Sequence, residues 1–449
     1  MPEIIKASLQ KIKLIFLFGI FLFPSITLCL SFICFNYINS FFLFDFQING
    51  KNTKEFLIQS AFYWVLILSL LYTSNLGEGT REIQRTIALG ILPFALFFSY
   101  KKQILRHHLL LQVSYIFANL ILIGIIYSFL IKGMAKDRMP ALPDMSFFEQ
   151  LKFLWSYPYE FVREKSIHRL GSSWFINHKT LLAFNFLTAS VFSINLLFKR
   201  QVYLLFKPLL VIVLTVFILC ILYTQSLINV SLLFLLPLYI VFLIKSQVFK
   251  VVFIFVLFLI GVFMFQKLDL KNTYSNRNTE AVINLWKSVK KGEINANSDS
   301  RLYINYCSFE RIKESPLFGF GVGDVQEQLN YCYKKHNFEP NIKKERIFNS
   351  HNYYTHLWLA GGVFCVFFFI ILLLYNGIKS IKFKHFAYTS ILIIIVVNLL
   401  FDNILLRYSG AVYFGLINTF LFITLKTYNN GLSIIKALKE IPLCIVLEI

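Results

Sequence analysis

The sequence is poor in charged residues for its length. Asp, Glu, Lys and Arg together make up 15% of its 449 residues, whereas hydrophobic residues make up 57% and phenylalanine alone occurs 51 times. This balance excludes a soluble protein of two or three domains, because the apolar runs are too many and too long for soluble cores. Each run approaches the roughly 20 residues that cross the hydrocarbon layer, so we predict an all-α polytopic membrane protein.

Acidic residues are especially scarce. The 44 Lys and Arg residues outnumber the 23 Asp and Glu residues, which gives a formal net charge of +21. In a membrane protein, basic residues mostly fix the topology and contact anionic headgroups, so we expect membrane lipid as a partner. No basic run is interleaved with exposed aromatic residues in a soluble domain, and we therefore expect no nucleic-acid partner.

The usual patterns for metals and nucleotides are also missing. The seven cysteines show no metal-ligand spacing, and His351 and His356 are five residues apart without an acidic cluster. The glycine-rich turn (316–323) lacks the lysine and the preceding strand of a phosphate-binding loop, which favours a structural turn. We therefore expect neither a metal nor a cofactor. Cys307 and Cys332 could form a disulfide across this turn if it faces an oxidising compartment.

Apolar runs separated by basic residues predict about twelve membrane spans. The spans are expected near 12–24, 25–46, 57–74, 83–99, 108–131, 179–198, 203–223, 228–245, 250–267, 353–375, 386–402 and 409–426. They divide the chain into N-terminal helices (1–131), a polar loop (132–178), central helices (179–267), a large polar loop (268–352), C-terminal helices (353–426) and a cytoplasmic tail (427–449). Basic residues fall in alternate short connections, which should face the cytoplasm, so both polar loops should face the opposite side.

The large loop contains an arginine suited to bind an anion. We expect a helix over Leu302–Lys313, capped by Asp299 or Ser300, with Arg301 in its first turn. Backbone N–H groups at a helix start and a guanidinium together make a good phosphate site. The alternative is a surface arginine on a capped helix.

His351 lies where this loop re-enters the membrane, followed by Asn352 and an aromatic cluster. An imidazole whose pKa lies near neutrality could accept a proton from a sugar hydroxyl as that hydroxyl attacks. The alternative is a histidine in the interfacial aromatic belt. The smaller loop contributes Arg169 and His178, which emerge on the same predicted face and could share one site.

Four short motifs follow one another in the chain: Ser300-Arg301, Pro316-Leu317-Phe318-Gly319-Phe320-Gly321, His351-Asn352-Tyr353-Tyr354 and Gly361-Gly362. In this order they resemble the O-antigen ligase superfamily, which includes O-antigen ligases, O-antigen polymerases and protein O-oligosaccharyltransferases. The resemblance is specific over about 300–362 and extends more loosely to most of the chain. It implies a GT-C-like fold of about twelve membrane helices in the inner membrane, with a large periplasmic loop.

The resemblance also implies an activity, namely transfer of a glycan from undecaprenyl diphosphate to the lipid A core without metal or nucleotide. His351 would orient or deprotonate the acceptor hydroxyl, and Arg301 would bind the diphosphate. Further substrate contacts would come from Arg169, Asn352 and His178.

One position departs from the family pattern. Leu227 stands where an arginine commonly follows a serine. Either Arg169 or another loop cation supplies that charge, or the chain is a divergent polymerase-like enzyme, or it is inactive. A polymerase that extends the lipid-linked glycan is the alternative within this class, and a lipid-linked glycan transporter is the alternative from another class.

Overall fold

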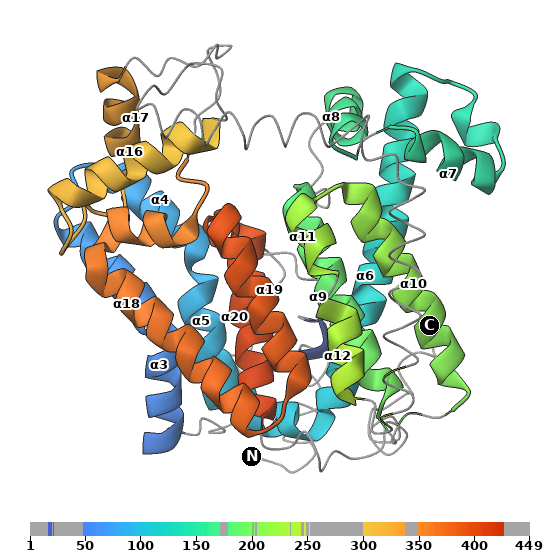
Figure 1. The fold of residues 1–449 in the computed structure, drawn as a ribbon, viewed down its shortest axis with the longest axis horizontal. Coiled ribbons are helices and arrows are strands. Elements are labelled where there is room, and N and C mark those ends of the chain that lie inside the picture. The colour runs from blue at the N-terminus through green and yellow to red at the C-terminus, as the bar shows by residue number, and fades with distance from the viewer. Residues whose placement is uncertain are drawn as a thin grey trace, which may run out of the picture.

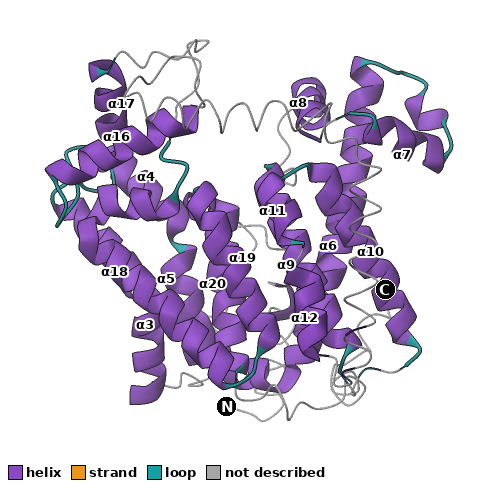
Figure 2. Ribbon diagram, in the orientation of Figure 1, coloured by secondary structure: helices purple, strands orange, loops and turns teal. Residues whose placement is uncertain are grey.

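The computed structural model describes most of the chain. The described residues are 17–19, 21, 48–157, 159–170, 178–199, 202, 204–233, 235–243, 247, 251, 300–336 and 349–425. Within these ranges the chain forms helices and connecting loops and no strand, in agreement with the predicted all-α class (Figure 2). The predicted spans 12–24, 25–46 and 250–267 and the tail 427–449 lie entirely or almost entirely outside the described residues.

Each of the other predicted spans coincides with a described helix or helix pair. The helices are α3 (Gly50–Leu68), η1 (Ser69–Leu71), α4 (Leu76–Thr86), α5 (Ala88–Ala95), the π-helical η2 (Leu96–Tyr100), α6 (Lys101–Asp137), η3 (Leu142–Asp144), α7 (Phe147–Trp155), α8 (Tyr159–Leu170), α9 (Lys179–Leu197), α10 (Phe206–Thr224), α11 (Leu227–Leu232), α12 (Leu235–Leu243), α16 (Ser300–Glu314), α17 (Val325–Lys335), α18 (Tyr353–Lys382), α19 (Phe386–Phe401), η4 (Ile404–Leu406) and α20 (Tyr408–Thr424).

Among the described residues, 5 helical segments are long and apolar enough to cross a membrane, by length and composition. They are Gly50–Leu71, Leu76–Asp137, Lys179–Leu197, Phe206–Thr224 and Tyr353–Lys382. The second segment is not straight, because α6 is kinked at His107, which has non-helical backbone angles. The total of twelve spans stays a prediction.

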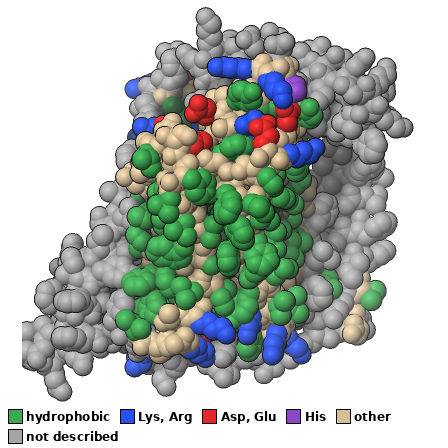
Figure 3. Space-filling view, turned by 90° about the vertical axis from the view of Figure 1, so that its left-hand side faces the viewer, with side chains coloured by type: hydrophobic (Ala, Val, Ile, Leu, Met, Phe, Trp, Pro, Cys, Tyr) green, Lys and Arg blue, Asp and Glu red, His purple; other side chains and the backbone are tan. Residues whose placement is uncertain are grey.

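The basic connections lie together at one end of the bundle. Lys101 at the start of α6 donates to Asn52 and Glu55 at the start of α3, with N–O distances of 2.7 and 2.9 Å. Lys199 after α9 lies close enough to His385 before α19 to interact with it electrostatically. Figure 3 shows an apolar band on one face, with Lys and Arg below it and charges of both signs above it. This agrees with the predicted alternation of the connections.

The two polar loops fold at the other end of the bundle. Figure 1 shows α7 and α8, from the smaller loop, at the same end as α16 and α17, from the large loop. The short helix α4 lies there as well, between α16 and the membrane helix α5 (Figure 1). Residues from both loops are therefore placed where they could contribute to one site.

Inside the bundle, buried amide side chains from different helices bond to one another. Gln59 of α3 donates to Asn376 of α18 at 2.7 Å, Asn376 donates to Asn418 of α20 at 3.1 Å, and Asn418 donates back to Gln59 at 2.9 Å. All three side chains are almost fully buried. Because a buried polar group without a partner is costly, this closed triangle fixes how α3, α18 and α20 pack.

Candidate functional site at the polar end of the bundle

The large loop enters the bundle through the capped start of α18. The Asn352 side-chain oxygen accepts hydrogen bonds from the backbone N–H groups of Tyr354 and Thr355, at 2.9 and 3.3 Å. These bonds satisfy two of the N–H groups that a helix start leaves without partners. The side-chain oxygen Oδ1 of Asn352 is thus engaged in capping the helix. A contact of this side chain with substrate stays a prediction.

His351 precedes this cap in a left-handed backbone conformation. Its φ is 47°, which is uncommon for a residue with a Cβ atom. Its backbone N–H donates to Asn349 Oδ1 at 3.1 Å, and the residue is half-buried. The structure therefore places His351 at the junction of the loop and the helix, as the sequence predicted, and its catalytic role stays a prediction.

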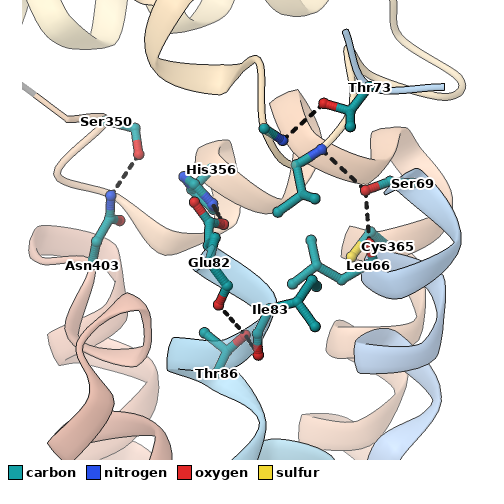
Figure 4. Close-up of polar contacts among 12 residues, drawn as sticks. Leu66, Ser69, Thr73, Glu82, Ile83, Thr86, Ser350, His356, Cys365 and Asn403 are labelled. Carbon is teal, nitrogen blue, oxygen red and sulfur yellow. Dashed lines mark hydrogen bonds and ion pairs between the residues drawn. The ribbon is translucent and has the colours of Figure 1, made fainter. Parts of the chain in front are cut away.

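Asp402 and Asn403, directly after α19, connect the ends of the two polar loops. One Asp402 carboxylate oxygen lies 3.9 Å from Nδ1 of His178, which precedes α9. The Asn403 amide donates to the Ser350 hydroxyl at 2.7 Å (Figure 4). His178 therefore contacts Asp402, and Ser350, the residue before His351, contacts Asn403. The two polar loops thus meet at the end of α19.

The glycine-rich turn packs against a break in α18. Gly362 has φ 65° and ψ −165°, a conformation essentially restricted to glycine, and the break leaves the carbonyls of Leu359 and Ala360 outside the helical pattern. The backbone N–H groups of Phe320 and Gly321 donate to these two carbonyls, at 2.7 and 3.0 Å. The turn thus supplies hydrogen bonds to a broken helix, which agrees with its interpretation as a structural turn.

The segment between α3 and α4 holds the end of this turn. The Gly323 N–H donates to the Thr73 hydroxyl at 3.0 Å (Figure 4). The buried Asp324 carboxylate accepts from the backbone N–H groups of Ser74 and Asn75, at 2.6 and 2.8 Å. Because these bonds come from distant parts of the chain, they fix the large loop relative to the membrane helices.

A disulfide between Cys307 and Cys332 joins α16 to α17, as the sequence suggested. Buried beside it, Arg311 donates to the Gln328 side chain, and its guanidinium lies 4.9 Å from the centre of the Phe320 ring. Arg311 is therefore a structural cation that holds the two helices on the glycine-rich turn.

Arg301 lies in the first turn of α16, as predicted from its capping pattern. The side chains of residues 300–303 lie outside the described part of the structure, as does that of Arg169 on α8. Figure 1 shows α16 and α8 at the same end of the bundle. The binding roles of Arg301 and Arg169 stay predictions.

Glu310 on α16 forms a second link to α17. Its carboxylate lies 2.7 Å from both Lys335 Nζ and His336 Nε2. The hydrogen bond from Lys335, with a smaller effect of His336, holds the pKa of Glu310 below its usual value. The ligand atoms of Glu310, Cys332 and His336 lie within 4.8 Å of one another, a spacing that a metal ion could use. Since Cys332 is in the disulfide and Glu310 already holds two basic groups, this cluster is better explained as an ion-paired link.

A carboxylate–imidazole contact that the sequence did not indicate joins α4 to α18. His356 Nε2 lies 2.7 Å from Glu82 Oε1, and the two side chains are 4% and 18% exposed (Figure 4). The His356 ring stacks on that of the fully buried Tyr353. Tyr353 and His356 belong to the aromatic cluster that follows Asn352 in the sequence and was expected at the membrane surface, whereas the structure buries both side chains. Glu82 and His356 are separated by 274 residues, so no local pattern could have predicted their contact.

The glycine-rich turn, His351 and the start of α18 lie in a segment that is similar to a known protein family. Residues 210–370 match the O-antigen ligase family. The match confirms the predicted resemblance to the O-antigen ligase superfamily, whose members are ligase- or polymerase-like glycosyltransferase enzymes. Together with the apolar helices, it indicates a membrane protein. No curated protein matches the chain.

The O-antigen ligase segment runs from α10 into α18 and includes the position where an arginine was expected. Leu227 begins α11 and is 53% exposed. Before it, Gln225 ends α10 in a left-handed conformation, and Ser226 accepts a hydrogen bond from Asn229 at 3.0 Å. Asn229 also pairs with Asn398 of α19 through two hydrogen bonds of 3.0 Å. The stretch is therefore an ordered turn beside α19 that contributes no cation.

Several residues at this end lie outside the O-antigen ligase segment and are brought to it by the fold. Glu82, His178, Asp402 and Asn403 come from the N-terminal, central and last helices. Asp402 was not among the site residues predicted from the sequence. A carboxylate directly after an apolar span, on the side of the polar loops, was the signal that could have identified it. Asn403 and Glu82 offered no such signal.

Proposed function

We propose that the protein is an O-antigen ligase-like glycosyltransferase that moves a glycan from undecaprenyl diphosphate to the lipid A core on the periplasmic face of the inner membrane. The observation that carries this proposal is the position of His351. It lies in the segment that matches the O-antigen ligase family, and both polar loops meet beside it at Asp402 and Asn403. A histidine at this place can exchange a proton where a lipid-linked donor reaches the membrane surface.

The proposed reaction is a single displacement at the anomeric carbon. The acceptor hydroxyl oxygen forms the new bond to this carbon while the bond to the diphosphate oxygen breaks. The hydroxyl proton passes to His351, and undecaprenyl diphosphate leaves with the bonding electron pair. Arg301 stabilises the negative charge that grows on the leaving diphosphate. Because the displacement occurs in one step, it inverts the configuration at the anomeric carbon.

Leu227 stands where the family commonly has an arginine, so another residue has to provide this positive charge. Arg407 is our candidate for that cation. It precedes α20, four residues after Asn403, and it is half-buried. Its guanidinium has no hydrogen-bond or ion-pair partner among the described residues. The backbone N–H of Arg407 donates to Ile404 at 3.1 Å, which fixes it close to Asn403. A guanidinium can bind the oxygens of a diphosphate through two parallel hydrogen bonds.

The transporter alternative predicts charged side chains within the membrane part of the bundle. Among the described residues, the Asp and Arg residues that are buried are Asp324, Asp402 and Arg311. They all lie at the end where the polar loops fold, and the buried groups that link α3, α18 and α20 are neutral amides. This distribution favours a site at one membrane surface over a path across the membrane.

The disulfide supports the assignment of the large loop to the periplasm. Disulfides form and persist in oxidising compartments such as the bacterial periplasm, and they are rare in the cytosol. Cys307 and Cys332 lie on helices of the large loop, at the end opposite the basic connections.

A lipopolysaccharide gel of a deletion strain tests the function and separates the alternatives. Loss of a ligase leaves bare core while lipid-linked polymer accumulates, and this is the expected result. Core capped with one repeat unit would instead indicate a polymerase, and absence of periplasmic polymer would indicate a transporter. Complementation with the parent gene should restore the ladder of capped lipopolysaccharide.

A further inference from the structure

Two buried side chains hold the residues on either side of His351. The Ser350 side chain is fully buried, and Asn403 is 1% exposed. The Asn403 amide Nδ2 donates to the Ser350 hydroxyl oxygen at 2.7 Å, and the Ser350 hydroxyl donates to the backbone carbonyl of Asn352 at 3.2 Å. A chain of two hydrogen bonds thus runs from the end of α19 across the residues that flank His351, and Figure 4 shows the first of them, between Asn403 and Ser350.

The direction of these bonds depends on the amide of Asn403. A serine hydroxyl has one proton, and it can give that proton to the Asn352 carbonyl only if its other neighbour does not accept it. The amide Nδ2 of Asn403 is a donor and does not accept it. A carboxylate at position 403 would attract the hydroxyl proton to itself, and the bond to Asn352 would be lost.

This chain of hydrogen bonds maintains the left-handed backbone conformation of His351. His351 has φ 47°, and a residue with a Cβ atom keeps such a conformation only where its surroundings fix it. Ser350 is anchored to Asn403 on one side, and Asn352 is anchored to α18 by its cap on the other. The direction in which the imidazole leaves the backbone is therefore set by these anchors.

Asn403 is itself held on a rigid element. Its carbonyl accepts the N–H of Leu406 at 3.1 Å in η4, and the preceding Asp402 N–H donates to Asn398 at 2.9 Å. By contrast, no donor among the described residues reaches the Asn403 side-chain oxygen, although it is buried. An amide with one half unsatisfied is a poor choice for stability alone. Of the two polar atoms of this amide, only the donor Nδ2 makes a hydrogen bond among the described residues, to the Ser350 hydroxyl.

We propose that Asn403 is a positioning residue that sets the orientation of His351 through the Ser350 hydroxyl. The inference rests on the proposed function, because it assigns to His351 the role of receiving the acceptor proton. Without Asn403 or Ser350, the imidazole keeps its chemistry but loses its alignment with the acceptor hydroxyl. Misplacement of a catalytic group by about 1 Å can lower a rate by about 100-fold.

The first test measures glycan transfer by the purified full-length protein and its variants. The donor is undecaprenyl-diphosphate-linked glycan extracted from the deletion strain, and the acceptor is bare lipid A core from the same cells. Asn403→Ala, Asn403→Asp and Ser350→Ala should each lower kcat by about 100-fold and leave the KM for the donor within about 2-fold of the parent. The double variant Asn403→Ala, Ser350→Ala should be no slower than either single variant, because both act through one chain of bonds.

The matched control is Asn376→Ala. Asn376 is as deeply buried as Asn403 and also bonds to other side chains, but it lies in the amide triangle inside the bundle. This control should lower the melting temperature while leaving kcat close to that of the parent. The proposal is overturned if Asn403→Ala and Ser350→Ala keep the parent kcat, or if their effects multiply in the double variant.

A second measurement does not depend on activity. Hydrogen–deuterium exchange should be faster for the backbone N–H groups of residues 350–355 in Asn403→Ala than in the parent, and unchanged there in Asn376→Ala. Unchanged exchange in folded Asn403→Ala would overturn the proposal. Failure of the proposed function has a different signature, because then the parent transfers no glycan or His351→Ala transfers it as the parent does.

Discussion

Glu82 on α4 contacts His356 at the start of α18, with 2.7 Å between the carboxylate oxygen and the imidazole nitrogen. The two side chains are mostly buried, so they are shielded from the solvent that weakens surface ion pairs. This contact fixes α4 against the helix turn that follows His351 and Asn352. It therefore helps to hold the start of α18, which directly follows the proposed catalytic histidine.

Replacing Glu82 by Gln should destabilise the protein. A buried hydrogen bond that includes a charged group contributes about 2 kcal/mol, and the amide would also leave the imidazole without its charged partner. Differential scanning fluorimetry in detergent should show a lower melting temperature. Glu78→Gln is the control on the same helix, because Glu78 pairs with Arg81 at an exposed position and should change stability by less than about 0.5 kcal/mol. Equal melting temperatures of Glu82→Gln and the parent would exclude a stabilising role.

Replacing Gly362 by Ala should disrupt the packing of the glycine-rich turn. Gly362 has a positive φ, and an added Cβ would lie 2.0 Å from the Leu317 carbonyl oxygen. Strain and overlap of this kind cost about 3 kcal/mol or more, so we expect poor folding and loss of activity.

Gly377→Ala on the same helix is the matched control for Gly362→Ala. Nothing lies within 4 Å of a Cβ at Gly377, and alanine favours a helix over glycine by roughly 0.5–1 kcal/mol. Circular dichroism melts should therefore show opposite shifts for the two variants. A Gly362→Ala variant as stable as Gly377→Ala would contradict the described break in α18.

The link between α16 and α17 should depend on pH through Glu310. Because the folded protein lowers the pKa of this carboxyl, mainly through Lys335, its contribution is full above the unfolded pKa of about 4.3. The contribution is lost as the pH falls through the lower folded pKa. Glu310→Gln should therefore melt earlier than the parent at pH 7, and this difference should shrink as the pH drops below about 4. Glu327→Gln, exposed on α17, is the control. A difference for Glu310→Gln that persists unchanged in acid would count against the assignment.

Arg407→Gln should weaken binding of the lipid-linked donor. If Arg407 binds the diphosphate, loss of its charged hydrogen bonds, worth about 1.5–3 kcal/mol, should raise the KM for the donor by about 10-fold or more. Arg81→Gln is the control, since this arginine is exposed on α4 and pairs with Glu78. Initial rates over a range of donor concentrations decide the matter, and an unchanged KM would exclude Arg407 as the second cation.

The membrane helices could be predicted because their signals are local. Spans expected at 179–198 and 203–223 correspond to α9 (Lys179–Leu197) and α10 (Phe206–Thr224), since each is one apolar run bounded by polar residues. The capping pattern around Ser300 predicted the start of α16 for the same reason. The Cys307–Cys332 disulfide could be suggested because two cysteines flank a turn within one loop.

The contacts that complete the candidate site could not be predicted, because they join distant segments. Asn403 meets Ser350 across 53 residues, and Glu82 meets His356 across 274. The sequence shows Gly362 as part of a motif, but its positive φ follows from the approach of the glycine-rich turn. No local spacing carries this kind of information.

The most direct test of the account is glycan transfer by His351→Ala in the deletion strain. The variant should be present in the membrane at the level of the parent, while the lipopolysaccharide gel shows bare core and accumulated lipid-linked polymer. The parent gene in the same plasmid should restore the capped ladder. A normal ladder with His351→Ala would contradict the claim that this histidine receives the acceptor proton.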